Sequence, residues 1–472
     1  MNHLSNLFNE NERKTYFQFA KLNLPRHTSY PSSNHWTKSS DSIPWKREMA
    51  AIVKTGRPLS VYVHVPFCEK LCHYCGCNKL IISRNNEDSD AFAKRYLQGI
   101  EQELAHLTSV DRWNVQQIHF GGGTPTWLKP HIFTRLWDLI LKNVNLSPSA
   151  EVSIELDPRV TTTAHLQTLR DLGFNRISLG VQDFDSNVQS AIERIQPFEM
   201  VKSFVDECRS LGLNNINFDL IYGLPRQTRH SMSQTLEKVC QLSPDRIAFY
   251  RLALMPEVFK WQRTFQQSEI PDDDSVLDMM LMATKIFQNH NYQFIGLDHF
   301  AKATDELSRS MLDGTLKRSF QGMTTGDVLP VIGLGPSAIS STDNFFHQNE
   351  PVFQSWTRKV AEDIPTVKHY KLSDDDLICR WCINQLYCYR KLDKDLFEAT
   401  FHKSFDSFFS HRLAALTELE TLNIILLNQR QITLKPYVGW LLLRVVAAVF
   451  DKFLGPEDWK IGLPSGVASR VG

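Results

Sequence analysis

Residues 62–79 of the chain read YVHVPFCEKLCHYCGCNK, an apolar run that leads into four closely spaced cysteines. The cysteines are Cys68, Cys72, Cys75 and Cys77, and their spacing is CxxxCxxCxC. Thiols this close together cannot all pair as unstrained disulfides, because a disulfide requires a particular separation and orientation of its two residues. Thiolates are preferred ligands of soft metals, so the segment predicts a metal site.

Two kinds of metal site fit this spacing. A zinc site normally takes a second pair of Cys or His residues further along the chain, although Cys77 could supply its fourth ligand. A short run of three thiolates is more typical of an iron–sulfur cluster in which one iron keeps an open coordination position. We favour the cluster, and expect its open iron to bind a ligand other than cysteine.

The composition limits the class of protein. At 472 residues the chain is long enough for two or three domains. Its 52 basic residues balance 52 acidic residues, so no overall charge favours nucleic acid or an acidic membrane surface. Nine cysteines, four of them bunched, are typical of a reducing compartment, and we expect a cytoplasmic protein.

The apolar stretches do not indicate export or membrane insertion. The N-terminal residues carry charges where a secretory signal would have an apolar run. The longest apolar stretch, Val438–Phe450, is interrupted by Arg444 and is shorter than the ~20 residues that a membrane-spanning helix needs. We predict a buried helix at Val438–Phe450 and no membrane partner.

Short apolar runs alternate with longer amphipathic stretches between about Leu59 and Tyr250. This alternation predicts an α/β fold, in which βα units surround a parallel sheet and form a partial or complete barrel. Chemistry in such folds lies at the carboxyl ends of the strands. The predicted strands are Leu59–Val65, Val115–Phe120, Val152–Leu156, Arg176–Val181, Ile216–Ile221 and Arg246–Tyr250.

The remainder of the chain predicts three further regions. The first 50 residues suggest an extended arm, and Ile295–Ser341, which includes Phe320 to Gly322, has too many turn residues for a helix pair. After about Val352 the chain is rich in Trp, Leu and Phe, and apolar runs at Ile424–Leu427 and Ile432–Leu434 suggest a two-stranded wing. The predicted regions are an N-terminal arm at 1–52, a barrel domain at 53–300, a barrel-mouth segment at 301–351 and a helical, winged-helix-like domain at 352–472.

Residues that could bind a ligand lie at the carboxyl ends of two predicted strands. Gly121–Gly123 would let backbone groups approach a ligand closely, although three glycines can also form a simple turn. Glu155 could accept hydrogen bonds from hydroxyl or amino groups, or it could be a solvated loop carboxylate. Both lie at the strand ends where the cysteines lie, which favours a shared site.

The cysteine spacing resembles that of the radical S-adenosylmethionine superfamily, and a longer series of motifs resembles the oxygen-independent coproporphyrinogen III oxidase family. The resemblance extends from Pro25 nearly to the C-terminus. The motifs occur in the order PRHTSYP, VHVPFC, CGCNK, FGGGTPT, IELDPR, GVQDF, FDLIYGLP, GLDHFA and GPSAIS.

The resemblance implies a radical S-adenosylmethionine partial (β/α)6 barrel with a mostly helical C-terminal domain. It implies a [4Fe–4S] cluster on Cys68, Cys72 and Cys75, and two molecules of S-adenosylmethionine as cosubstrate. One chelates the open iron and is cleaved to a 5′-deoxyadenosyl radical. The implied activity is that of an oxidoreductase, which decarboxylates two propionates of coproporphyrinogen III to vinyl groups and gives protoporphyrinogen IX in haem biosynthesis.

The resemblance also implies roles for single residues. Cys77 would be free of iron and catalytic. Its presence favours the oxidase branch of the family, because related haem chaperones usually lack this fourth cysteine. It further implies an electron donor such as flavodoxin or ferredoxin, a monomer, and no nucleic-acid partner. The implied S-adenosylmethionine-binding residues are Tyr62, Tyr74, Gly122, Gly123, Thr124, Glu155, Gln182, Arg194, Asp219, Ala253 and Ile339.

Three basic residues and two departures from the motifs bear on the substrate. Arg26, Lys79 and Arg251 are candidates for binding its carboxylates, with ordinary surface cations as the alternative. Leu254 stands where relatives have a histidine, and Met323 where they have a tyrosine. A diverged paralogue that acts on another tetrapyrrole or as a haem chaperone is therefore the alternative function.

Other cysteines and histidines have structural interpretations. The spacing of Cys379, Cys382 and Cys388 suits core positions on one helix face better than a second metal site. His64, His119 and His299 flank predicted strand ends, where they could move protons or be satisfied structural residues.

Overall fold

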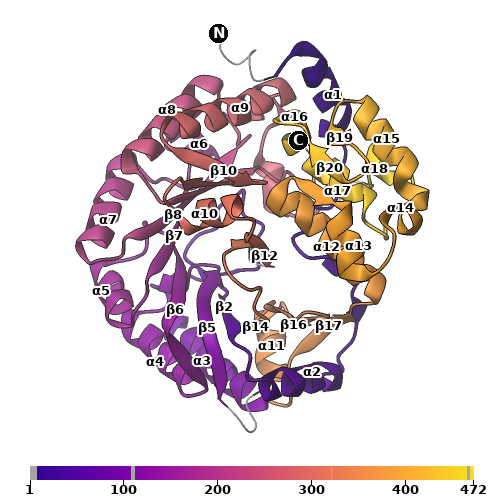
Figure 1. Ribbon diagram of the computed structural model, residues 1–472. Coiled ribbons are helices and arrows are strands. Elements are labelled where there is room, and N and C mark those ends of the chain that lie inside the picture. Colours follow the sequence, from indigo (N-terminus) through magenta and orange to yellow (C-terminus); the bar gives the residue numbers. More distant parts are fainter. Residues whose placement is uncertain (1–7, 108–111, 320–321, 465–467, 472) are drawn as a thin grey trace. The chain divides into compact units, whose positions relative to one another are not determined.

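The computed structural model describes residues 8–107, 112–319, 322–464 and 468–471 (Figure 1). The chain divides into two compact units. The cysteine unit comprises His35–Asp219 and Leu329–Lys371, and the helical unit comprises Met1–Asn34, Leu220–Val328 and Leu372–Gly472.

Four parallel strands form the centre of the cysteine unit. They are β2 (Leu59–Val65), β5 (Trp113–Gly122), β6 (Val144–Leu156) and β7 (Arg176–Gln182), paired in that order. Their apolar residues are buried, as expected of strands covered on both faces. The helices that follow β2, β5, β6 and β7 are α3 (Ser89–Leu107), α4 (Pro130–Leu141), α5 (Thr163–Asp171), α6 (Ser186–Ala191) and α7 (Phe198–Ser210).

Aromatic packing holds these helices against the strands. Figure 1 shows α4 and α5 on the outer side of the strands. The ring of Phe120 in β5 lies 5.1 Å from Phe133 of α4 and 5.6 Å from Phe174, measured between centroids. All three rings are at most 4% exposed. Removing one such ring would cost about 3–5 kcal/mol.

The sheet of the cysteine unit continues beyond β2. Strand β14 (Val331–Leu334) pairs with β2 in parallel, and antiparallel strands follow it. The antiparallel strands are β15 (Ile339–Ser341), β16 (Phe345–Asn349), β17 (Thr366–Lys371) and β1 (Thr37–Lys38).

The predicted βα pattern is confirmed. Strand β2 has the predicted bounds, β8 (Asn215–Tyr222) extends the prediction by one residue at each end, and β9 (Arg246–Arg251) extends it by one residue at its carboxyl end. Strand β6 begins at Val144 rather than Val152, because Val144–Leu146 already pairs with Trp113–Val115 before a register shift. The polar residues at 147–149 concealed that first part in the sequence.

The helical unit contains groups of strands and a helical core. Antiparallel β9, β11 (His299–Lys302) and β10 (Tyr292–Gly296) lie next to one another in the strand order. The predicted wing is confirmed as β19 (Ile425–Leu427) and β20 (Gln431–Leu434), with β18 (Lys391–Asp393) as a third strand that the sequence did not reveal. Its main helices are α1 (Glu10–Ala20), α8 (Arg229–Leu242), α9 (Asp273–Asn289), α12 (Asp374–Tyr389), α13 (Lys394–Phe401) and α15 (Leu413–Thr421).

One prediction for this unit holds with a change, and a second holds as it was made. Val438–Phe450 is buried as predicted, but it forms two helices, α16 (Val438–Leu441) and α17 (Leu443–Val449), rather than one. Cys379, Cys382 and Cys388 are buried in α12, as expected of core residues. Within the described ranges, no helix is both long and apolar enough to span a membrane.

The region Ile295–Ser341 consists of short elements, as its turn residues predicted. They include α10 (Glu306–Leu312), β12 (Lys317–Ser319) and β13 (Gly322–Thr324). Phe320 and Gln321, which belong to the predicted turn, lie outside the described residues.

The prediction of an extended N-terminal arm is wrong for two segments. Helix α1 begins with a capping box, in which Asn9 and Glu12 each accept the other's backbone N–H. Helix α2 (Ile43–Lys54) belongs to the cysteine unit, where Trp45 stacks on His347 with ring centroids 5.0 Å apart. Burial of one face of each helix stabilises it, which the sequence prediction did not weigh.

Candidate functional site

The four clustered cysteines lie on one loop at the carboxyl end of β2. The chain passes from β2 through β3 (Phe67–Cys68) into the loop and returns as β4 (Leu80–Ile81), which pairs with β3. Within the loop, Cys75 N donates to Cys72 O at 3.1 Å, and Lys79 Nζ donates to the carbonyls of Cys75 and Cys77. The predicted location at a strand end is therefore confirmed.

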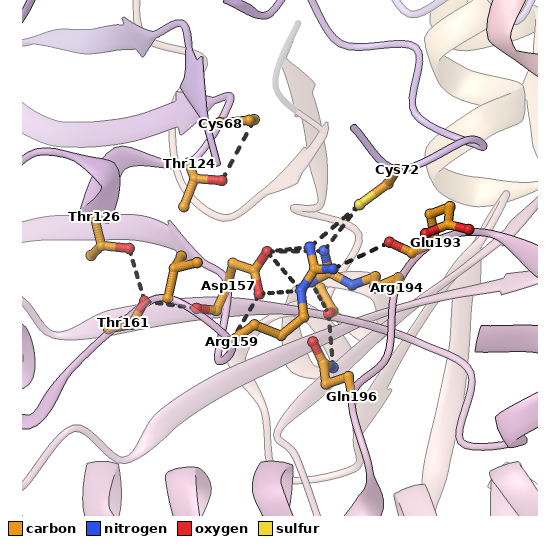
Figure 2. Close-up of polar contacts among 12 residues, drawn as sticks. Cys68, Cys72, Thr124, Thr126, Asp157, Arg159, Thr161, Glu193, Arg194 and Gln196 are labelled. Atoms are coloured by element: carbon orange, nitrogen blue, oxygen red, sulfur yellow. Dashed lines mark hydrogen bonds and ion pairs between the residues drawn. The ribbon is translucent and has the colours of Figure 1, made fainter. Parts of the chain in front are cut away.

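Side chains from elsewhere in the unit donate hydrogen bonds to the sulfurs of Cys68 and Cys72. Thr124 Oγ1 donates to Cys68 Sγ at 3.6 Å, and two arginines donate to Cys72 Sγ (Figure 2). Burial raises the pKa of the Cys68 thiol to about 12, against the opposing effect of Thr124. A bound metal would deprotonate such a thiol regardless.

Cys75 and Cys77 share a hydrogen bond that distinguishes them. The bond from Cys77 lowers the pKa of Cys75, and the same bond raises the pKa of Cys77. Cys75 is therefore the better thiolate ligand of the two.

The thiols do not yet converge on one point. In the parts of the chain that the structure describes, no three Cys, His, Asp or Glu side chains lie close enough to hold an ion. The donor set nevertheless suits an iron–sulfur cluster, because four thiols lie on one loop and N–H and O–H groups point at their sulfurs.

The glycine turn after β5 packs against the end of β2. A Cβ on Gly122 would lie 2.5 Å from the His64 ring, and one on Gly123 would lie 2.6 Å from Phe67 O. Gly123 N and Thr124 N donate to the carbonyls of Val65 and Phe67. Glycine is therefore required here for packing, and this packing brings Thr124 against Cys68.

Glu155 lies beside the glycine turn as a charged acceptor. Gly122 N donates to its Oε2 at 3.1 Å, and His119 Nε2 lies 3.4 Å from its Oε1. Burial alone would raise its pKa, but His119 and the Gly122 N–H lower it below the usual value. The side chain is 42% exposed, so it has room to accept further hydrogen bonds.

Aromatic and histidine side chains surround Glu155. Tyr62 stacks on the His119 ring at 5.9 Å between centroids. The Tyr62 hydroxyl lies 3.0 Å from His64 Nδ1, and His64 Nε2 lies 2.9 Å from Asn78 O. His64 and His119 thus have defined hydrogen-bond or ring partners, as expected if they are satisfied structural residues.

Asp219 and Gln182 lie on the next strands. Ser178 and Asn217 each donate to the Asp219 carboxylate at 3.0 Å. Burial, followed by the charge of Glu155, raises the pKa of Asp219 to about 6. Gln182 is buried with a φ of +65°, and a Cβ on Gly180 would lie 2.8 Å from its Nε2.

Arg194 reaches the cysteine loop from the segment between α6 and α7. Reciprocal hydrogen bonds between Gln189 and Gln196 close that segment. The Arg194 guanidinium donates to Gly180 O at 2.6 Å and to Asp157 Oδ2 at 3.1 Å, besides Cys72 Sγ at 3.6 Å (Figure 2).

Asp157 and Arg159 were not predicted as site residues. Arg159 donates to Cys72 Sγ at 3.4 Å and to Asp157 Oδ2 at 2.7 Å. Both residues belong to the motif IELDPR, of which only Glu155 was singled out. The signal available in the sequence was an acidic and a basic residue, Asp157 and Arg159, shortly after Glu155, which was itself predicted to accept hydrogen bonds from a ligand.

Comparison with known proteins assigns the chain to a family. The profile of the Radical SAM superfamily matches residues 62–239. The chain is 36% identical over 435 residues to the oxygen-independent coproporphyrinogen III oxidase of Salmonella typhimurium, covering 91% of this chain and 93% of that protein. The chain belongs to the oxygen-independent coproporphyrinogen III oxidase family.

Other members of this family support the assignment. The Escherichia coli (strain K12) oxidase is 36% identical over 434 residues, with coverage of 91% and 93%. A solved structure of Escherichia coli coproporphyrinogen III oxidase, described as a radical SAM enzyme, superposes with a TM-score of 0.86 and 35% identity. It covers 91% of this chain and 98% of that chain, so the predicted α/β fold class is confirmed.

The structure brings most of the residues that the family resemblance implied into the cysteine unit. Tyr74 lies close enough to Arg194 for that charge to lower its pKa, although burial raises it overall. Ile339 begins β15, and its carbonyl lies 2.6 Å from the position of a Cβ on Gly333. Ala253 belongs to the helical unit, where its carbonyl accepts from Gln262 Nε2 at 3.0 Å.

The substrate candidates differ in their surroundings. In the helical unit, Arg26 pairs with Asp298, and Arg251 pairs with Asp273 at 3.1 Å. Lys79, in the cysteine unit, donates to loop carbonyls.

The two departures from the family pattern lie in the helical unit. Met323 packs against its apolar core, whereas Leu254 is 38% exposed. The apolar residue at 323 therefore has a packing explanation.

Proposed function

We propose that this chain catalyses the oxygen-independent oxidative decarboxylation of coproporphyrinogen III. Each of two propionates would lose one hydrogen atom, carbon dioxide and one electron, which an electron acceptor takes up, and would become a vinyl group, giving protoporphyrinogen IX in haem biosynthesis. The observation that carries this proposal is 36% identity over nine-tenths of both chains to oxidases with that name. The cysteine loop at the strand end supplies the matching chemistry.

Cys68, Cys72 and Cys75 would hold a [4Fe–4S] cluster, whose open iron would take S-adenosylmethionine. When bound and reduced, this pair supplies a 5′-deoxyadenosyl radical, which removes a hydrogen atom from a propionate. The cysteines fit the role because Cys75 has a lowered pKa and the sulfurs of Cys68 and Cys72 accept hydrogen bonds. Cys77 would remain a thiol near the reacting groups.

The neighbouring side chains would bind and orient two molecules of S-adenosylmethionine. Glu155 and Asp219 offer carboxylate oxygens to hydroxyl or amino groups, and Tyr62 and Tyr74 offer rings for adenine. The other residues proposed to surround these molecules are Gly122, Gly123, Thr124, Gln182, Arg194, Ala253 and Ile339.

Binding of the substrate carboxylates is proposed for Arg26, Arg251 and Lys79. Because Arg26 and Arg251 already pair with Asp298 and Asp273, a propionate must compete with those carboxylates. Bidentate guanidinium–carboxylate pairing would favour such an exchange. We further propose that the enzyme is a cytoplasmic monomer reduced by flavodoxin or ferredoxin.

The cysteine assignment is tested by anaerobic reconstitution with iron and sulfide. The wild-type chain and Cys77→Ser should bind four irons, whereas Cys75→Ser should lose most of its iron and all cleavage of S-adenosylmethionine. Iron content, the absorbance of the cluster and release of 5′-deoxyadenosine are the measurements. Loss of iron from Cys77→Ser as large as from Cys75→Ser would contradict the assignment, and zinc in place of iron would contradict the cluster itself.

A further inference from the structure

Cys72 receives hydrogen bonds from two arginines that share a single carboxylate. Arg159 Nη2 lies 3.4 Å and Arg194 Nη1 lies 3.6 Å from Cys72 Sγ. Both guanidinium groups also bind Asp157 Oδ2, at 2.7 Å and 3.1 Å. Figure 2 shows the two guanidinium groups side by side between Asp157 and Cys72.

This group of side chains has little access to water. The side chains of Arg159, Arg194 and Asp157 are 16%, 7% and 10% exposed. One carboxylate balances only one of the two cations, so one positive charge remains beside Cys72. At this degree of burial the charge is weakly screened.

The backbone fixes the Arg159 side chain. Asp157 Oδ1 accepts the Arg159 backbone N–H at 3.0 Å, and Arg159 Nη1 donates to Glu193 O at 3.4 Å. The Nη2 atom, which donates to Asp157 Oδ2, is thereby held where it also reaches the sulfur. A side chain that only balanced Asp157 would not need to reach Cys72.

We propose that Arg159 tunes the reduction of the cluster through its hydrogen bond to Cys72. The inference rests on the proposed function, which makes Cys72 a cluster ligand. Reduction adds an electron to the cluster, and a positive charge and N–H···S bonds stabilise the more negative state. Arg159 is thus a positioning residue that raises the reduction potential.

Asp157 has the opposite effect on the same sulfur. Its carboxylate neutralises one guanidinium group, so replacement by neutral asparagine would leave two unbalanced cations at Cys72. The structure therefore predicts shifts of opposite sign at two adjacent positions. General damage to the fold would not produce such a pair of shifts.

The test is a spectroscopic redox titration of the reconstituted full-length protein and four variants. We expect Arg159→Gln to make reduction about tenfold less favourable, about 59 mV for one electron, and Asp157→Asn to make it more favourable. Arg159→Lys retains charge without the forked N–H groups and should fall between Arg159→Gln and wild type. Arg176→Gln is the matched control, because Arg176 also pairs with a carboxylate, Glu151, and leaves Cys72 untouched.

The outcomes separate this inference from the proposed function. A wild-type chain that binds no cluster would overturn the proposed function. A wild-type chain with a cluster, but equal potentials or same-sign shifts in Arg159→Gln and Asp157→Asn, would overturn only the inference. If Arg159→Gln remains folded but binds no iron, Arg159 acts in holding the cluster and the tuning role is wrong.

Discussion

Two carboxylates, Glu155 on β6 and Asp219 on β8, differ in how they ionise. Hydrogen bonds from Gly122 and His119 lower the pKa of Glu155, so it is ionised throughout the neutral range. Burial and the charge of Glu155 raise the pKa of Asp219 to about 6. Of the two, only Asp219 changes its charge in mildly acidic solution.

The pH dependence of S-adenosylmethionine binding tests the role of Asp219. If its carboxylate accepts hydrogen bonds from the ligand, protonation below about pH 6 weakens binding. Titration about that value makes the dissociation constant about fourfold larger at pH 5.5 than at pH 7.5. Equilibrium dialysis with the reconstituted enzyme measures this change, and Asp219→Asn should remove it. Wild-type binding that is equal or tighter at pH 5.5 would exclude the role.

Helix α3 contributes to the site through one buried carboxyl group. Glu103 is fully buried and accepts hydrogen bonds from Gly335 N at 2.9 Å and Asn349 Nδ2 at 2.5 Å. Gly335 begins the turn after β14, and a Cβ there would lie 2.5 Å from His64 O. Glu103 therefore ties α3 to the loop that leads to Ile339.

The stability of a Glu103→Ala variant should depend on pH in a defined direction. Burial raises the pKa of Glu103 to about 8 in the folded chain, so the unfolded chain releases its proton first as pH rises. The stability of the wild type then falls between about pH 5 and pH 8. Loss of two hydrogen bonds should cost Glu103→Ala about 2 kcal/mol at pH 5 and less at pH 8.

Thermal unfolding of both proteins at pH 5, 6.5 and 8 measures this difference. Glu101→Ala is the control, because Glu101 is exposed on the same helix and should change stability by less than ~0.5 kcal/mol. A destabilisation by Glu103→Ala that grows with pH would show that Glu103 is ionised in the folded chain.

Elements with a local signal were predictable, and those that depend on distant partners were not. The apolar run of β2 and the cysteine spacing were sufficient to predict β2 and the loop after it. Strand β18 has three residues and depends on pairing with β20, which lies about 40 positions later. The sulfur contacts of Arg159 and Arg194 likewise join residues that the sequence separates from Cys72 by 87 and 122 positions.

At the scale of the whole molecule, the helical unit combines both ends of the chain. Arg444 donates to the carbonyls of Leu24 and Pro25 and, at 2.7 Å, to that of Ser469. The carbonyl of Arg470 accepts from the same group, so four backbone carbonyls from two terminal segments depend on one buried guanidinium group. Such a contact has no sequence pattern, which is why the N-terminal arm was the least accurate part of the predicted fold.

The identity of the tetrapyrrole product tests the central claim most directly, because it depends on both the radical chemistry and the substrate. The measurement is mass spectrometry of the product after anaerobic reaction of the reconstituted chain with reductant, S-adenosylmethionine and coproporphyrinogen III. We predict protoporphyrinogen IX, with two molecules of 5′-deoxyadenosine formed for each, one per propionate. Cleavage of S-adenosylmethionine with coproporphyrinogen III recovered unchanged would contradict the proposed substrate.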